Sequence, residues 1–247
     1  MQTLPQALLQ TAADPKMTDR YRVISTKDVI DIMEDQGYGV QKFKVDKTKK
    51  FDPDFGRHMV VFRKPDETAL VGEVAPQFIW TNSHNGRCSG QMRAGLYRFI
   101  CENGLIIGQD FAKDRILHSK TMADQVIERV RRLSSNTVSL FSKIEEWSKI
   151  ELSEDKRNYF ASEALKLRFG EERAKSYDSA TLLGIRRQQD EGYDLWKTFN
   201  RIQENAMKGD FLGKNQNGRQ VHARGIKGIT QDLTFNEGLW KLAEEMA

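Results

Sequence analysis

Residues 70–90 read LVGEVAPQFIWTNSHNGRCSG and predict the sheet-forming part of the chain. The first half ends in Phe78, Ile79 and Trp80, and aromatic and β-branched residues of this kind are enriched in strands. The run from Thr81 to Gly90 is polar or glycine almost throughout, which is typical of the connection between two strands. The stretch therefore predicts a strand followed by a hairpin connection.

Strands are expected on both sides of this stretch. Tyr38 to Val45 and His58 to Lys64 have a similar composition and lie between Gly, Pro and Asp residues. Residues 91–101 alternate as a strand would but also fit a helical face, and we favour a strand. It is expected to turn at Asn103 and Gly104 into a second strand over residues 105–108. These segments together predict an antiparallel β-meander.

The other segments follow helical spacing. Thr26 is expected to cap a short amphipathic helix that ends at Gly37. Beyond residue 120, apolar residues recur at helical intervals, so we expect a long helix that Ser134, Ser135 and Asn136 could interrupt. The residues of this apolar stripe are Val126, Val130, Leu133, Leu140, Ile144 and Trp147.

Three more helices are expected towards the end of the chain. One follows Ser153 and closes at Gly170, one spans Leu195 to Ala206, and a short one runs from Leu233 to Met246. Gly209 to Gly228 is rich in glycine and basic residues, so we expect a mobile loop there.

The order of these elements predicts an α+β fold, in which an N-terminal helix and an antiparallel β-meander pack against C-terminal long helices. We expect one domain over residues 19–247, with a sheet-rich half at 19–110 and a helical half at 111–247, after a flexible N-terminal arm at 1–18. The 38% hydrophobic residues suffice for a sizeable core. With only two cysteines, Cys88 and Cys101, and no run of eighteen apolar residues, we expect a cytoplasmic protein that does not contact membranes.

The common catalytic motifs are missing from the sequence. It contains no P-loop, GxSxG or HExxH pattern, and no two His or Cys residues have metal-ligand spacing. Cys101 follows Phe99 and Ile100, a setting that favours a core cysteine over a nucleophile. We therefore expect no catalytic residue, no metal and no cofactor, while a metal nuclease with scattered carboxylate ligands stays open.

A polar loop, Asn82, Ser83, His84 and Asn85, is the one segment with possible chemistry in the sheet-rich half. Its side chains all form hydrogen bonds, and we expect them to be exposed. The ordinary interpretation is that they close the turn, and a catalytic role for His84 is the alternative.

Basic residues form two clusters, although the net charge is only +4. Gln41 to Lys64 holds eight Lys or Arg against three Asp, and Asn205 to Thr230 holds five against the single Asp210. Cations along a track with aromatic residues among them favour binding of unpaired nucleic acid, whereas a lysine-guarded edge strand would give the same pattern. The candidate binding residues are Lys42, Phe43, Lys44, Lys47, Lys49, Lys50, Arg63, Lys64, Lys214, Arg219, Arg224 and Lys227.

A third polar set lies on and before the helix at Leu195 to Ala206. Either these residues form a buried network that fixes helix packing, or they form a strip that faces a ligand. The set comprises Arg186, Arg187, Asp190, Asp194, Trp196, Asn200, Arg201, Gln203, Glu204 and Asn205.

Several sequence motifs, in the order in which they occur along the chain, resemble those of one family, the phage- and plasmid-associated domain of unknown function 932 (DUF932). The matching words are His58-Met59-Val60, Thr81 to Gly86, Ala94-Gly95-Leu96-Tyr97-Arg98, Arg186-Arg187, Asp194-Leu195-Trp196, Thr198 to Arg201 and Gln203-Glu204-Asn205. The family usually has Asp where this chain has Asn85. The resemblance implies an accessory gene of a mobile element, such as a recombination protein or an inhibitor of host defence.

The expected order of helix, meander and long helices also resembles that of the phage single-strand annealing proteins. We therefore expect binding of single-stranded DNA, assembly into a homo-oligomer larger than a dimer, and annealing of complementary strands. The alternative is a protein inhibitor that binds a host defence protein, of the anti-restriction or anti-CRISPR type. A metal-dependent nuclease is the third hypothesis.

Overall fold

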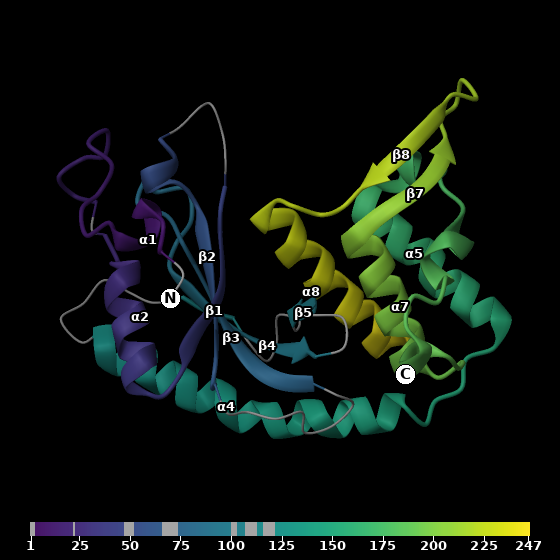
Figure 1. Cartoon of the computed structure of the whole chain (residues 1–247), viewed down its shortest axis with the longest axis horizontal. Coiled ribbons are helices and arrows are strands. Elements are labelled where there is room, and N and C mark those ends of the chain that lie inside the picture. Colours follow the sequence, from purple (N-terminus) through teal and green to yellow (C-terminus); the bar gives the residue numbers. More distant parts are fainter. Residues whose placement is uncertain are drawn as a thin grey trace. The chain divides into compact units, whose positions relative to one another are not determined.

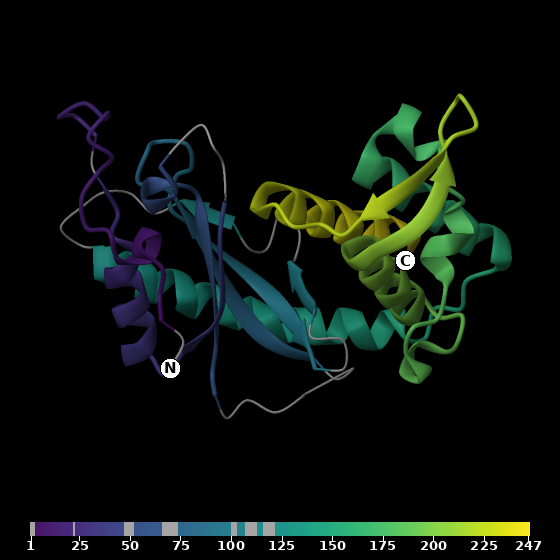
Figure 2. The ribbon, with the colours of Figure 1, turned by 45° about the horizontal axis from the view of Figure 1, so that its top comes forward.

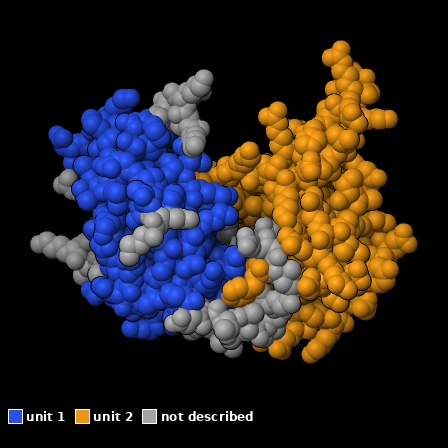
Figure 3. Space-filling model, viewed as in Figure 1, with its two compact units in different colours: residues 1–69, 75–97, 109–138 blue, residues 70–74, 98–108, 139–247 orange. Residues whose placement is uncertain are grey.

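The structure is a computed structural model that describes residues 3–21, 23–46, 52–65, 74–99, 103–106, 113–115 and 122–247. Its contacts divide the chain into two compact units (Figure 3). Unit 1 holds residues 1–69, 75–97 and 109–138, and unit 2 holds 70–74, 98–108 and 139–247. Helices and an antiparallel sheet confirm the α+β class. Over the described ranges, no helix is both long and apolar enough to cross a membrane.

The sheet of unit 1 is the expected meander (Figure 1). Its strands are β1 (Gly39–Val45), β2 (His58–Arg63), β3 (Val74–Asn82) and β4 (Gln91–Arg98), in that order, and the short β6 (Lys113–Arg115) pairs with β4. A 3-10 turn, η1 (Pro53–Phe55), precedes β2.

Helices cover one face of this sheet. Val60 and Phe62 of β2 lie opposite Trp80 and Phe78 of β3 and pack in one cluster with residues of three helices. These helices are α1 (Gln6–Leu9), α2 (Thr26–Asp35) and the first part of α4 (Met122–Trp147). The apolar stripe predicted for the long helix thus supplies core residues through Val126, Val130 and Leu133.

Two expectations near the N-terminus differ from the structure. Ser25 rather than Thr26 caps α2, because its hydroxyl accepts the N–H of Asp28. Residues 1–18 were expected as a flexible arm, yet Ala7 and Leu8 of α1 are buried in the unit 1 core. Burying this apolar pair is favourable enough to order a short segment.

Three further expectations are corrected. α4 runs without a break through Ser134 to Asn136. Strand β5 (Asn103–Ile106) begins where a turn was expected. The expected mobile loop is a hairpin of β7 (Gly209–Lys214) and β8 (Gln220–Arg224), and its register pairs Phe211 with Ala223. This hairpin forms because Phe211 and Ala223 have a buried side on which to pack.

Unit 2 is mostly helical. Besides the hairpin it contains α5 (Glu154–Phe169), α6 (Glu171–Ala174), η2 (Ser179–Leu183), η3 (Gln188–Asp190), α7 (Leu195–Lys208) and α8 (Ile229–Met246). Ser153 caps α5 and Gly170 closes it at φ 77°, as expected. α8 begins earlier than the expected Leu233. Figure 2 shows the β7–β8 hairpin beside α7.

The core of unit 2 is an aromatic cluster. Trp147 lies with its ring centroid 4.6 Å from that of Trp240 and 5.9 Å from that of Phe199, and Trp196 stacks on Phe199 at 5.7 Å. Aromatic pairs at these separations contribute about 1 kcal/mol each beyond their buried area. This cluster holds α7 and α8 and the end of α4 together.

Candidate functional site

The polar loop after β3 is buried, not exposed as expected. Asn82, Ser83 and His84 are at most 3% exposed, and only Asn85 is half-buried. The Ser83 hydroxyl accepts the N–H of Cys88 at 2.8 Å and donates to its carbonyl at 3.1 Å. The loop therefore closes on itself through side-chain hydrogen bonds, which supports the turn interpretation.

Thr26 connects this loop to α2. Its hydroxyl accepts the indole N–H of Trp80 at 3.0 Å and an amide N–H of Asn82 at 3.3 Å. The hydroxyl then donates to Nε2 of His58 at 2.7 Å, and Nδ1 of His58 donates to the Gly56 carbonyl at 2.9 Å. This arrangement requires neutral His58 with its proton on Nδ1. Burial, and then the neighbouring His84, lower the pKa of His58 to about 4.

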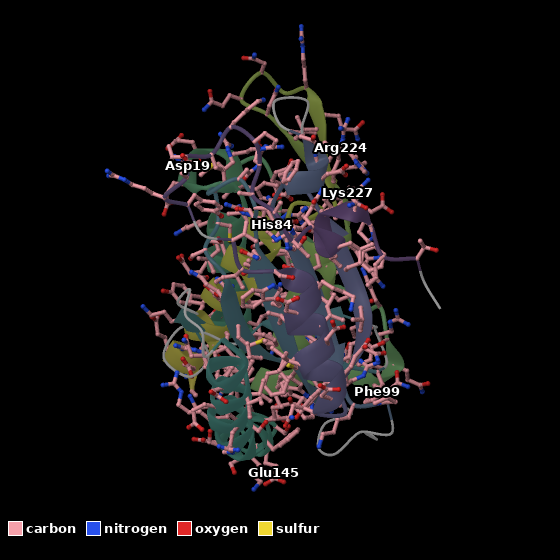
Figure 4. The ribbon with its side chains drawn as sticks, turned by 90° about the vertical axis from the view of Figure 1, so that its left-hand side faces the viewer. Asp19, His84, Phe99, Glu145, Arg224 and Lys227 are labelled. Atoms are coloured by element: carbon pink, nitrogen blue, oxygen red, sulfur yellow. The ribbon has the colours of Figure 1, made fainter. Side chains whose placement is uncertain are left out.

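His84, which Figure 4 labels, lies against His58, with the ring centroids 5.0 Å apart. Its side chain is fully buried, with the backbone of Ile24 as a polar neighbour. Burial lowers the pKa of His84, which keeps the ring neutral. Among the described residues no third ligand joins the two histidines in a metal-binding group. The two rings pack edge to face within unit 1.

The described members of the first basic cluster differ in exposure and in their contacts, and Lys42 and Lys64 are the exposed ones. Lys42 is exposed on β1, and Lys44 is half-exposed. Phe43, expected to stack on bases, packs against the unit 1 core instead. Arg63 lies 3.8 Å over the ring of Tyr97, and Lys64 lies 5.4 Å from the ring of Tyr38. The predicted binding residues Lys47, Lys49 and Lys50 lie outside the described residues.

The second basic cluster is brought together by the β7–β8 hairpin, which we call the ribbon (residues 209–224). Lys214 pairs with Gln220 and Leu212 with His222, and these four side chains share the exposed face, while Phe211 and Ala223 face inward. Arg224 continues the same face along β8 because side chains two apart in a strand point the same way.

A bulge shapes the start of the ribbon. The register shifts between Gly209 and Phe211, and both Gly209 and Asp210 have positive φ, of 71° and 65°. A Cβ on Gly209 would lie 2.7 Å from the Ala223 carbonyl oxygen, so only glycine fits there. The bulge directs the Asp210 carboxylate to Nε2 of His222 at 3.0 Å.

The cations of the ribbon are unpaired. Lys214, Arg219, Arg224 and the nearby Lys227 are exposed, and in the part of the chain that the structure describes none of their side chains has a hydrogen bond or ion pair. Figure 4 labels Arg224 and Lys227. The one acidic side chain on the ribbon, Asp210, is held by His222. The ribbon therefore presents net positive charge.

Arg168 of α5 supports the ribbon from beneath, which the sequence did not reveal. Its buried guanidinium donates to the Arg224 carbonyl and lies 4.6 Å from the ring centroid of Phe169 and 5.3 Å from that of Phe211. Burial lowers the pKa of Arg168 to about 10, so the side chain stays charged at neutral pH. Tyr177 stacks on Phe169 at 4.5 Å and completes this support.

The polar residues of α7 form a buried network, which supports the first of the two interpretations. Arg98 forms two hydrogen bonds with Asp190, of 2.6 and 3.0 Å, and both side chains are at most 3% exposed. Asn205 donates to the carbonyls of Leu182 and Gly184 at 3.0 and 2.7 Å. The Asn205 bonds tie α7 to the end of η2, and the Arg98–Asp190 pair ties the end of β4 to η3.

Glu204 is the charged centre of the α7 network. It accepts from Arg187 at 3.1 Å and from Lys208, and only 1% of its side chain is exposed. Burial opposes ionisation, but the hydrogen bonds from Lys208 and Arg187 outweigh it and hold the pKa of Glu204 below its usual value. The single Glu204 carboxylate thus offsets part of the positive charge of Arg187 and Lys208.

These features define an α+β protein with a basic two-stranded ribbon anchored on helices. The chain belongs to the family described as domain of unknown function (DUF932), whose model matches residues 16–240. It is similar to two proteins of Escherichia coli strain K12. UPF0380 protein YafZ is 35% identical over 236 residues, which cover 93% of this chain and 83% of that protein. UPF0380 protein YfjQ is 34% identical over the same shares. No solved structure matches the chain.

Proposed function

We propose that this protein binds nucleic acid, with the ribbon as the main contact surface and single-stranded DNA as the preferred form. The observation that carries the proposal is the set of four exposed, unpaired cations Lys214, Arg219, Arg224 and Lys227. Four other lysines of unit 2 are paired with carboxylates: Lys143 with Glu244, Lys166 with Glu163, Lys175 with Glu172 and Lys208 with Glu204.

The cations of the ribbon suit a phosphate backbone. Each cation that neutralises a phosphate releases a counterion, so four contacts give a slope of about −3 when log affinity is plotted against log salt concentration for a single strand. Affinity then falls about fiftyfold between roughly 50 and 200 mM salt. No contact to a base edge is needed for this part of the binding.

The exposed face of the ribbon also holds a surface for unpaired bases. Leu212 is 54% exposed and lies across from His222, whose side chain is 52% exposed. A flat imidazole next to an apolar side chain offers a place for a base to stack once it is free of a duplex. This pairing supports a preference for single strands, and annealing of complementary strands is the activity to test first.

The test is fluorescence anisotropy with labelled single-stranded DNA and the matching duplex, with and without magnesium. We expect tighter binding of the single strand, and the double variant Lys214→Gln/Arg224→Gln should lower the salt slope by about half. The matched control is Lys143→Gln/Lys166→Gln, which removes two cations that are paired to carboxylates and should leave the slope unchanged. Absence of binding to any nucleic acid at low salt would overturn the proposal, and magnesium-dependent cleavage would favour the nuclease hypothesis.

A protein inhibitor of a host defence system is the second candidate. It is favoured by three large apolar side chains at the surface of unit 2, Tyr159, Ile185 and Tyr193, each at least 53% exposed. Aromatic side chains of this kind anchor protein interfaces. A protein that binds no nucleic acid but inhibits a purified restriction or CRISPR nuclease would support this candidate.

A further inference from the structure

A pocket of about 360 Å³ lies where the segment Lys175–Asp178 meets the ribbon. Tyr177 forms an antiparallel bridge with Gly213, and the N–H of Lys214 donates to the Ser176 carbonyl at 2.7 Å. The segment thereby lies against β7 through an isolated bridge and one backbone hydrogen bond. The lining residues are Lys175, Ser176, Tyr177, Asp178, Leu212, Gly213, Lys214 and Gln220.

The floor of the pocket is rigid. A Cβ on Gly213 would lie 2.0 Å from the Ser176 carbonyl oxygen, so the two backbones approach this closely only because residue 213 is glycine. Beneath these backbones the Tyr177 side chain is 7% exposed, and its ring centroid lies 5.4 Å from that of Phe211. A site with this support is formed before a ligand arrives.

The wall of the pocket offers unused polar groups. Within the described part of the chain, the side chains of Ser176, Lys214 and Gln220 have no hydrogen-bond partner. The two other charged residues are already engaged: Lys175 bonds Glu172 at 2.8 Å, and the Asp178 carboxylate accepts the N–H of Ala180 at 2.9 Å. The free groups are thus one cation, one amide and two hydroxyls, those of Ser176 and the buried Tyr177, with Leu212 as an apolar neighbour.

We infer that this pocket takes one unpaired nucleotide of a bound strand, an inference that rests on the proposed function. Lys214 contacts the phosphate, while the Gln220 amide and the Ser176 hydroxyl bond the edge of the base. A side-chain amide can donate and accept at once, which matches the mixed donor and acceptor edge of a base. The volume lies in the range of small-ligand sites.

This geometry explains how the ribbon distinguishes strands. In a duplex the Watson–Crick edge is used by the opposite base, so it cannot reach Gln220. The phosphates of both forms can still reach Lys214. Loss of the amide therefore affects single strands, whereas loss of a ribbon cation outside the pocket affects both forms.

The experiment compares Gln220→Ala with Gln216→Ala, a matched control at the exposed tip of the same hairpin and outside the pocket lining. Anisotropy titrations use a labelled single-stranded DNA and its duplex at one salt concentration. Gln220→Ala should weaken single-strand binding about five- to tenfold, the effect of one or two lost hydrogen bonds, and leave duplex binding within about twofold. Ser176→Ala should act in the same direction, and Gln216→Ala should change neither.

The outcomes separate the two proposals. If the wild type binds single strands but Gln220→Ala weakens both forms equally, or neither, the pocket inference is wrong and the proposed function stands. If the wild type binds no nucleic acid, both fail. A single-stranded RNA of the same sequence forms the third arm, and equal losses on DNA and RNA would show that the pocket contacts base and phosphate but not the sugar hydroxyl.

Discussion

Acidification should destabilise unit 1 through His58. The ring is held neutral because Thr26 donates to Nε2, Nδ1 donates to the Gly56 carbonyl, and the side chain is fully buried. In the unfolded chain the pKa returns to its ordinary value of 6.5, whereas burial lowers it to about 4 in the folded chain. Between these values only the unfolded chain takes up the proton, so stability is lost as the pH falls.

The magnitude follows from the two pKa values. One pKa unit corresponds to about 1.4 kcal/mol, so a fall from about pH 7 to about pH 5 lowers the free energy of unfolding by about 2 kcal/mol through His58 alone. The loss stops near pH 4, below which the folded chain is protonated too. The buried His84, whose pKa is also lowered, adds to the loss in the same direction.

The assay equilibrates the protein in increasing urea at about pH 5, 6 and 7 and then labels it with a short deuterium pulse at one fixed pH. Mass spectrometry of peptides from β2 and β3 reports the unfolding of unit 1, and the fixed pulse makes exchange rates comparable. We expect the midpoint to fall with pH in the wild type. In His58→Gln, which does not titrate in this range, most of the dependence should disappear.

The control is His222→Gln, which replaces an exposed histidine of unit 2 and should leave the pH dependence of the β2 and β3 peptides unchanged. An equal pH dependence in wild type and His58→Gln would refute the account of a neutral, hydrogen-bonded His58. A midpoint that rises on acidification would refute the sign of the argument.

Three further expectations concern stability and assembly. Asp190→Asn should lower the free energy of unfolding of unit 2 by about 3–5 kcal/mol, because it leaves the buried Arg98 without its counter-charge. The control is Glu128→Gln, which removes an exposed ion pair and should cost under about 1 kcal/mol; thermal unfolding measures both variants. Ser25→Ala should cost about 1 kcal/mol by removing the cap of α2, and urea unfolding that matches the wild type would contradict this. Light scattering should give a mass above twice the 28.5 kDa of one chain, because β1 is an edge strand that can pair with another copy. A monomeric mass that does not change when single-stranded DNA is added would exclude both assembly and annealing.

Local sequence patterns were sufficient to predict most of the helices and strands. The apolar spacing in α4, the Ser153 cap and Gly170 end of α5, and the composition of β2 each act within a few residues of the chain. Helix caps and strand alternation depend on neighbours in sequence, so they can be predicted without knowing the fold. The same holds for the concentration of charge between Asn205 and Thr230.

What the tertiary structure decided depends on residues far apart in sequence. The loop at residues 82–85 is polar, yet it is buried because Asn82 bonds Ile24 and His84 packs on His58. A polar side chain becomes buried when distant partners satisfy it, and the sequence alone does not identify those partners.

The ribbon is a second case in which the sequence alone did not identify the partners of a residue. Glycine is typical of loops, but Gly209 is needed for a bulge and Gly213 for the approach of the Ser176 backbone, and both positions lie in a strand. The sequence alone determined that cations gather in this segment. Only the fold decided that Lys214 and Arg224 share one exposed face of a hairpin beside a pocket, because Arg168 and Tyr177 support the ribbon from its buried side.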